Sequence, residues 1–83
     1  KKGSNMSKPI TPVGIHTEYI QIDQLLKYEG IIETGGQIKA LIDDQIITIN
    51  GQLCTEKRKK CYVGDIISIE GLDMDLKIVK EEE

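Results

Sequence analysis

The sequence predicts a small domain of the α+β class. Apolar residues recur at helical spacing in residues 22–29 and again in residues 35–44. β-Branched residues fill residues 46–49, and the Asn50-Gly51 pair that follows is the strongest short-range signal of a β-hairpin. Helices and strands of this length fit a chain of 83 residues, which is enough for one domain with a modest core.

The composition limits how that core can be filled. The chain has no Trp or Phe and three Tyr, so Ile and Leu must supply the buried volume. No run approaches the ~20 apolar residues of a membrane span, and no signal peptide is visible. We therefore expect a cytoplasmic protein without a membrane partner.

The first residues are expected to lie outside the domain. Residues 1–14 are polar and contain Pro9 and Pro12, which predicts a disordered lead-in. The five residues before Met6 look like an expression-tag remnant, so the natural chain is expected to start at Met6. A strand is predicted at 15–20, where the domain begins.

The first helix is predicted at residues 22–29. Ile22, Leu25 and Leu26 form its apolar stripe, and Gly30 fits the left-handed position that ends a helix. Ile31 and Ile32 are then expected to pack between the two helices.

The second helix is predicted at residues 35–44. Thr34 and Gln37 have the spacing of a capping box, in which the hydroxyl accepts from the amide of residue 37 and the Gln37 side chain reaches back. Lys39 and Asp43 are spaced as an i, i+4 ion pair, worth a few tenths of a kcal/mol.

Short strands and turns make up the remainder of the predicted domain. Asn50 is expected to have positive φ in the hairpin turn, and Asp65 is expected to close a second turn at residues 63–65. An acidic tail follows the domain. The predicted segments are strands at 46–49, 52–55, 66–69 and 76–79, a basic loop at 57–60, the domain at 15–80 and the tail at 81–83.

The charge distribution points to one basic segment in an acidic chain. The net charge of −3 argues against an avid general nucleic-acid binder. Residues 57–60, Lys-Arg-Lys-Lys, form the only basic run, and each cation that contacts a phosphate would displace counterions. The alternative for this run is a solvated hairpin loop.

The sequence carries no pattern of an enzyme or a metal site. Cys54, Cys61 and the lone His16 are too few for a structural zinc site, and the cysteine spacing matches no redox motif. A reduced pair with Cys61 in the core is expected, with a disulfide as the alternative, and His16 is given no role. There is no nucleophile–base pattern or P-loop. We expect no catalytic residue and no cofactor.

The order of these elements resembles the S4 RNA-binding domain. The resemblance covers residues 20–69, and the Thr-Gly-Gly-Gln turn with the short length is similar to stand-alone bacterial S4-like proteins that associate with ribosomes. The residues that carry it are Leu25-Leu26-Lys27, Gly30-Ile31, Leu41-Ile42, Ile47-Thr48-Ile49-Asn50-Gly51 and Gly64-Asp65.

The resemblance implies a fold, a partner and a binding surface. The fold would be two helices packed on a small antiparallel sheet, and the partner would be structured RNA, ribosomal RNA above all, bound by a monomer. Ribosomal proteins are further candidate partners. The implied RNA-binding residues lie beside Thr34 on the helix face and in the basic run: Lys27, Gly35, Gly36, Gln37, Lys39, Lys57, Arg58, Lys59 and Lys60.

The chain departs from the family pattern at two positions. Many S4 domains have Ser-Arg where this chain has Thr34-Gly35, and a basic residue where Gln21 stands. The missing cations leave a second hypothesis open, a protein-interaction adaptor on an S4 scaffold with weak or no RNA affinity.

Several candidate residues also have purely structural alternatives. Gly35 and Gly36 could leave the backbone amides accessible to a phosphate, or could permit a tight turn or close helix packing. Gln37 could serve as a cap or as an RNA contact. Tyr28 and Tyr62 could stack on an exposed base, or could be partly buried in the core.

Overall fold

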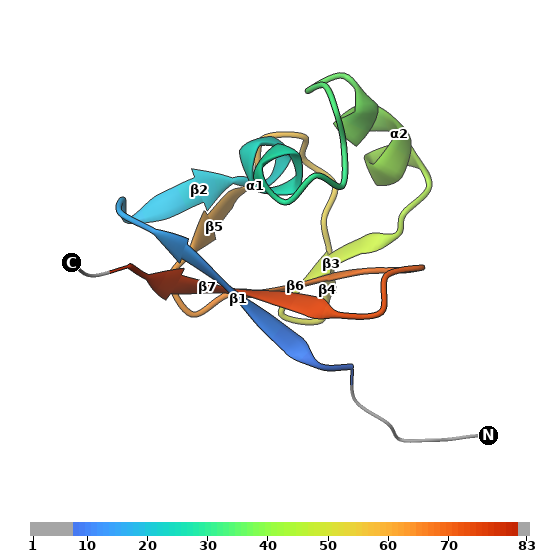
Figure 1. The fold of residues 1–83 in the computed structure, drawn as a ribbon. Helices are drawn as coiled ribbons and strands as arrows, with labels where there is room; N and C mark the ends of the chain where they lie inside the picture. Colours follow the sequence, from blue (N-terminus) through green and yellow to red (C-terminus); the bar gives the residue numbers. More distant parts are fainter. Residues whose placement is uncertain (1–7, 82–83) are drawn as a thin grey trace.

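In a computed structural model, which describes residues 8–81, two short helices lie on one side of a five-stranded sheet (Figure 1). A separate two-stranded sheet pairs β2 with β5. The α+β class is therefore confirmed. The elements are β1 (Ile10–Ile15), β2 (Tyr19–Gln21), α1 (Ile22–Tyr28), α2 (Gln37–Asp43), β3 (Ile47–Ile49), β4 (Gln52–Leu53), β5 (Lys60–Tyr62), β6 (Ile66–Ile69) and β7 (Asp75–Lys80).

The larger sheet is mixed, whereas an antiparallel sheet was expected. Its strand order is β1-β7-β6-β3-β4, and the pairs β3–β4, β3–β6 and β6–β7 are antiparallel. The edge pair β1–β7 is parallel, with Ile10 opposite Asp75 and Ile15 opposite Lys80. The first and last strands of the domain thus lie side by side.

The prediction of a disordered lead-in is wrong for residues 10–14, which form most of β1. Proline lacks an amide hydrogen, so Pro12 argued against a strand, but β1 is an edge strand where that hydrogen has no partner to meet. Val13 is only 1% exposed, so the segment contributes to the core. The remaining predictions for the termini, including the tag remnant and the end of the acidic tail, fall on residues 1–7 and 82–83, which lie outside the described residues.

The strand predicted at 15–20 is broken by a turn at residues 16–18. Here the chain leaves the larger sheet and enters β2, and the Thr17 hydroxyl donates to the carbonyl of Tyr19 at 2.7 Å. The partner of β2 is β5, which was not predicted. Because β5 begins at Lys60, the last residue of the basic run lies in a strand rather than in the loop.

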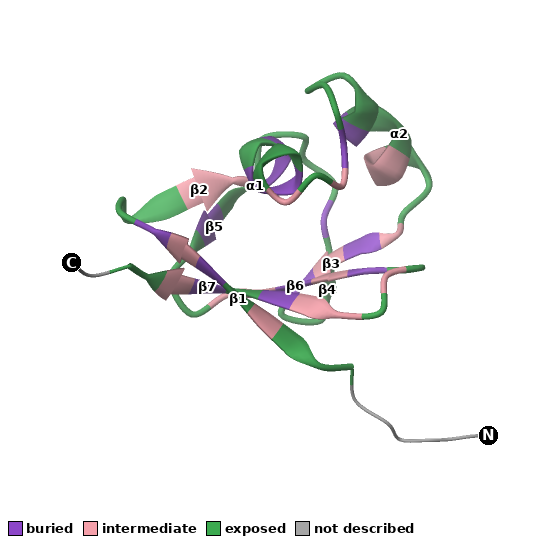
Figure 2. Cartoon of the chain, viewed as in Figure 1, coloured by how far each residue is buried: buried purple, intermediate pink, exposed green. Residues whose placement is uncertain are grey.

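The core between the helices and the two sheets consists mainly of aliphatic residues. Figure 2 shows where buried positions lie on these elements. In β7 the buried residues alternate with exposed ones, as expected for a strand with one face on the core. Ile31 is half-buried and Ile32 is buried. The residues less than 2% exposed are Val13, Ile22, Leu25, Leu26, Ile47, Cys61, Ile67, Leu76 and Ile78.

The end of α1 is built as the sequence predicts. Gly30 has a φ of +77°, the left-handed conformation that glycine adopts without strain. The amide of Ile31 donates to the carbonyl of Leu26 at 2.8 Å, and the amide of Gly30 donates to that of Lys27 at 3.0 Å. This pair of bonds is a Schellman motif, and it reverses the chain toward α2.

Asn50 and Asp65 tie the two predicted turns to each other. The Asn50 side chain donates to the Asp65 carboxylate at 3.0 Å and accepts from the amide of Ile66 at 3.0 Å. The other Asp65 oxygen accepts from the amide of Tyr62 at 2.8 Å, which closes the second turn. The residues between Asn50 and Asp65, including the basic run, are therefore held at both ends.

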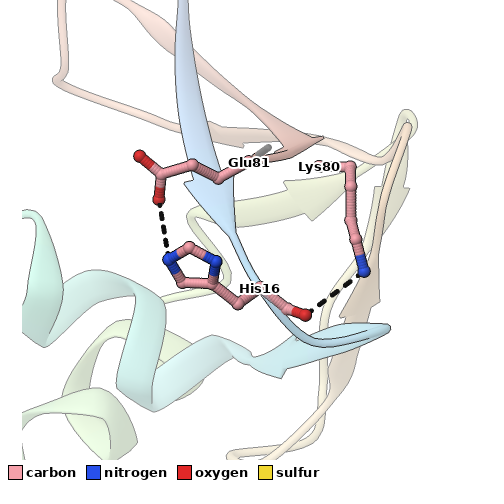
Figure 3. A network of polar contacts seen from close by, with 3 residues as sticks. All are labelled: His16, Lys80 and Glu81. Atoms are coloured by element: carbon pink, nitrogen blue, oxygen red, sulfur yellow. Dashed lines mark hydrogen bonds and ion pairs between the residues drawn. The ribbon is translucent and has the colours of Figure 1, made fainter. Parts of the chain in front are cut away.

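The C-terminal end of β7 is fastened to the turn after β1 (Figure 3). The His16 ring lies 3.3 Å from the Glu81 carboxylate, and the Lys80 ammonium donates to the His16 carbonyl at 3.2 Å. The amide of Glu81 also donates to the carbonyl of Ile15. A Cβ at Gly14 would lie 3.1 Å from that of Glu81, so glycine permits this close approach. His16, which was given no role, thus has a structural partner.

Substituting Gly51 tests the hairpin. Gly51 has a φ of +85° with open space around it, so Gly51→Val adds backbone strain without a steric clash. We expect a loss of stability of about 1–3 kcal/mol. Gly35→Val is the matched control, because that position is equally open and its φ is not positive. Urea midpoints that move equally in both variants would contradict the turn assignment.

Candidate functional site

All nine residues predicted to form the binding surface are exposed. They come from three parts of the chain. α1 supplies Lys27, and α2 with the turn before it supplies residues 35–37 and 39. The segment that follows β4 supplies residues 57–59, and the first residue of β5 is Lys60. Figure 1 shows α1, α2 and that segment on the same side of the five-stranded sheet. All nine residues are therefore accessible to a partner.

The basic run lies against the start of α1. The amide of Ile22, the first residue of α1, donates to the carbonyl of Lys59 at 2.8 Å. Lys60 pairs with Gln21 in the β2–β5 ladder. These contacts fix the backbone at Lys59 and Lys60, and the side chains of all four residues are exposed. Lys27 lies five residues further along α1, about 8 Å from that end of the helix.

The start of α2 is capped by Gln37 and not by Thr34. The Gln37 side-chain oxygen accepts from the amides of Glu33 and Thr34, the latter at 3.1 Å. No side-chain hydroxyl caps the helix, whose N-cap residue is Gly36. The reach-back half of the predicted capping box is confirmed, and the Thr34 half is wrong. The chain already turns helically before Gln37, since its amide donates to the carbonyl of Thr34 at 3.2 Å.

Neither the backbone conformation nor the packing of neighbouring atoms requires glycine at positions 35 and 36. A Cβ at Gly35 would meet nothing within 4 Å, and one at Gly36 would meet only the Thr34 hydroxyl at 3.9 Å. Neither residue has a positive φ. The alternative of close helix packing is therefore not supported. Within the described chain the amides of Gly35 and Gly36 donate no hydrogen bond, and both residues are exposed.

Among the predicted site residues, Lys39 has an acidic partner on its own helix. Lys39 pairs with Asp43 at 3.0 Å, as its spacing predicts. Both side chains are mostly exposed, so the pair adds little stability and can open to a stronger partner.

Sequence reasoning missed an aromatic cluster on β2 and β5. Tyr19 lies opposite Tyr62, with 5.6 Å between ring centroids, and the Lys60 ammonium lies 4.9 Å above the Tyr19 ring. The signal available in the sequence was the alternation of Tyr19, Ile20 and Gln21, but it was assigned to a longer strand. Tyr28, the other tyrosine considered, is 69% exposed on α1.

The cysteines belong to the core. Cys54 and Cys61 are both buried, and neither forms a disulfide. Burial raises the pKa of the Cys61 thiol to about 12. Burial also raises the pKa of Cys54. Both therefore stay protonated near neutral pH, where a thiol is a poor nucleophile and metal ligand. Among residues 8–81 no three His, Cys, Asp or Glu side chains gather as metal ligands, and no helix there is long and apolar enough to cross a membrane.

Comparison with known proteins agrees with this arrangement. Residues 13–78 match the family model described as S4 domain. The chain is 35% identical over 60 residues to the "Probable ribosome maturation protein RlbA" of Bacillus subtilis (strain 168), which covers 72% of this chain and 84% of that protein. The matched range begins in β1 and ends in β7, so it includes the parallel edge pair.

The cap of α2 gives a direct test of the local geometry. Gln37→Ala removes an acceptor from two amides, and we expect a loss of about 1 kcal/mol. Thr34→Ala removes a hydroxyl that makes no cap and should shift stability by less than about 0.5 kcal/mol. Urea denaturation of both variants measures the difference. A larger loss in Thr34→Ala would restore the hydroxyl as the cap.

Proposed function

Because the chain belongs to the S4 domain family, we propose that it binds structured RNA, ribosomal RNA in particular, without catalysing a reaction. The observation that carries the proposal is the basic run. Four consecutive exposed cations stand beside the start of α1, on the side of the sheet that also bears α2. The name of the Bacillus relative supports a ribosomal target, and with it action in the cytoplasm. We propose that the protein binds as a monomer.

The binding mechanism rests on phosphate contacts and shape. Double-stranded RNA hides its base edges in a deep, narrow groove, so proteins recognise it chiefly by backbone geometry. Lys57, Arg58, Lys59 and Lys60 supply the cations, and Lys27 and Lys39 extend the contact along the helices. The backbone of the run is fixed before RNA arrives, which lowers the entropy lost on binding.

The turn before α2 adds a second contact. The amides of Gly35 and Gly36 donate no hydrogen bond within the described chain, and a Cβ at either position would have open space around it. In the proposal an RNA phosphate approaches these amides, since successive backbone amides in a turn can bind an anion. In this proposal the two glycines serve in place of the arginine that many S4 domains carry.

The salt dependence of RNA binding tests the basic run. In a plot of log affinity against log salt concentration, the slope reports the number of phosphate contacts. Replacing Lys57, Arg58, Lys59 and Lys60 by Gln should make this slope shallower by up to about three units, at ~0.7–0.9 per phosphate contact. Affinity for deproteinised ribosomal RNA, measured over a salt series, provides the slope.

The matched control changes the net charge equally on the other face of the sheet. Lys77 is exposed between the buried Leu76 and Ile78, and Lys8 lies beside Thr48 and Ser68. The pair Lys8→Glu and Lys77→Glu should leave the slope unchanged. Equal slopes in the parent and in the quadruple variant would exclude the basic run from the RNA-binding site. Retention by ribosomal particles without affinity for the deproteinised RNA would favour the protein-interaction adaptor.

Substituting Gly36 tests the turn separately from the run. Gly36 has a φ of −70°, so Gly36→Ala should change stability by less than about 1 kcal/mol. The added methyl group blocks the approach of a phosphate to the amides. We expect RNA affinity to fall about tenfold, the loss of one hydrogen bond to a charged group. A variant that binds like the parent would restrict the contact to the cations.

A further inference from the structure

The outer face of the β2–β5 sheet carries two tyrosines side by side. In the antiparallel register Tyr19 lies opposite Tyr62. Two residues further along β2, Gln21 lies opposite Lys60. The pair between them, Ile20 and Cys61, points the other way, and Cys61 is 0% exposed in the core. Because side chains alternate along a strand, both tyrosines face solvent.

The two rings are only partly used by the fold. Tyr19 is 36% and Tyr62 is 48% exposed, and their planes are inclined at 50°. A cross-strand aromatic pair helps to hold two strands together, which accounts for the contact between the rings. It does not account for the ring surface left in water next to Lys60, whose ammonium lies 4.9 Å above Tyr19.

A hollow of about 290 Å³ opens beside Tyr62, between β5 and the chain that follows β4. Lys59 and Lys60 line it together with Leu53, Glu56 and Asp65. The two lysines suit a phosphate, whereas the apolar Leu53 and the Glu56 carboxylate do not, and the Asp65 carboxylate is already bonded to Asn50 and to the amide of Tyr62. A carboxylate does accept hydrogen bonds from the amino groups of a nucleobase. The hollow therefore combines features that a whole nucleotide, and not a phosphate alone, would match.

We propose that this face, the surface of Tyr19, Tyr62 and Lys60 with its adjoining hollow, stacks one unpaired base of the bound RNA. The inference rests on the proposed function and narrows its ligand to helices interrupted by a bulged or loop nucleotide. Lys59 and Lys60 hold the phosphates that flank the extruded base. Stacking on an aromatic ring tolerates any base, so the preference is for an unpaired nucleotide and not for a sequence.

Two matched hairpin RNAs test the proposal, one fully paired and one with a single unpaired fluorescent aminopurine in its stem. The parent protein should bind the interrupted hairpin more tightly and quench the aminopurine. Tyr62→Leu should lose roughly tenfold or more in affinity for the interrupted hairpin only, in line with base–aromatic stacking. Tyr62→Phe keeps the ring and should behave like the parent. Tyr19→Leu provides a second variant if Tyr62→Leu melts early.

The outcomes separate this inference from the proposed function. Equal binding of both hairpins by the parent, without quenching, overturns the stacking site and leaves RNA binding intact. A loss of affinity in Tyr62→Leu that is the same for both hairpins also overturns it, because the ring would then support the fold. Binding of neither hairpin, nor of deproteinised ribosomal RNA, overturns both. If the tyrosine variants bind RNA normally but are lost from ribosomal particles, the face contacts protein and the inference is wrong.

Discussion

The contact between Asn50 and Asp65 decides where the candidate surface lies. Asn50 sits in the turn between β3 and β4, and Asp65 sits in the turn between β5 and β6. Their side chains join each other and also bind the amides of Ile66 and Tyr62. The chain between them carries the four cations of the basic run, and this contact closes it at its base. Closed at its base, it can present the basic run at the start of α1 and pair β5 with β2.

The remaining constraints act on the same segment from the other side. The amide of Ile22 reaches the carbonyl of Lys59, so α1 and the basic run cannot move independently. Cys61 anchors β5 in the core, while its neighbours Lys60 and Tyr62 face outward. In this strand of three residues, the central side chain is buried and stabilises the fold, and the two flanking side chains are exposed. The small sheet is therefore both a structural support and a candidate binding face.

Local patterns in the sequence predicted the parts of this fold that depend on neighbouring residues. Gly30 and Asn50-Gly51 have the positive φ values that their positions require, and α1 starts and ends within one residue of its prediction. The missed elements depend on partners far along the chain. β1 is a strand because β7 lies beside it, although Pro12 argues against a strand. β5 has only three residues, too few for an alternation of apolar and polar residues to be recognised, and it was found only through its pairing with β2. For the same reason Tyr62 was considered alone, and its partner Tyr19 became visible only from the register. The nine site residues could be proposed from family resemblance, and their exposure is consistent with that role, but side-chain geometry was needed to assign the α2 cap to Gln37.

The acidic net charge does not oppose RNA binding at this surface. At physiological ionic strength a charge is screened beyond about 8 Å, so a phosphate responds to its immediate surroundings and not to the sum over the chain. Several acids have partners within the fold: Asp65 accepts from Asn50 and from the amide of Tyr62, Glu81 contacts the His16 ring and Asp43 pairs with Lys39. Glu56 and Asp65 both line the hollow beside Lys59 and Lys60, where we propose that a base, rather than a phosphate, binds. In the function we propose, the arrangement offers four adjacent cations to the RNA backbone while the net charge of −3 keeps non-specific attraction to nucleic acid low. Affinity would then depend on the shape of the RNA as well as on its charge, which is the property required to select one folded site among many helices.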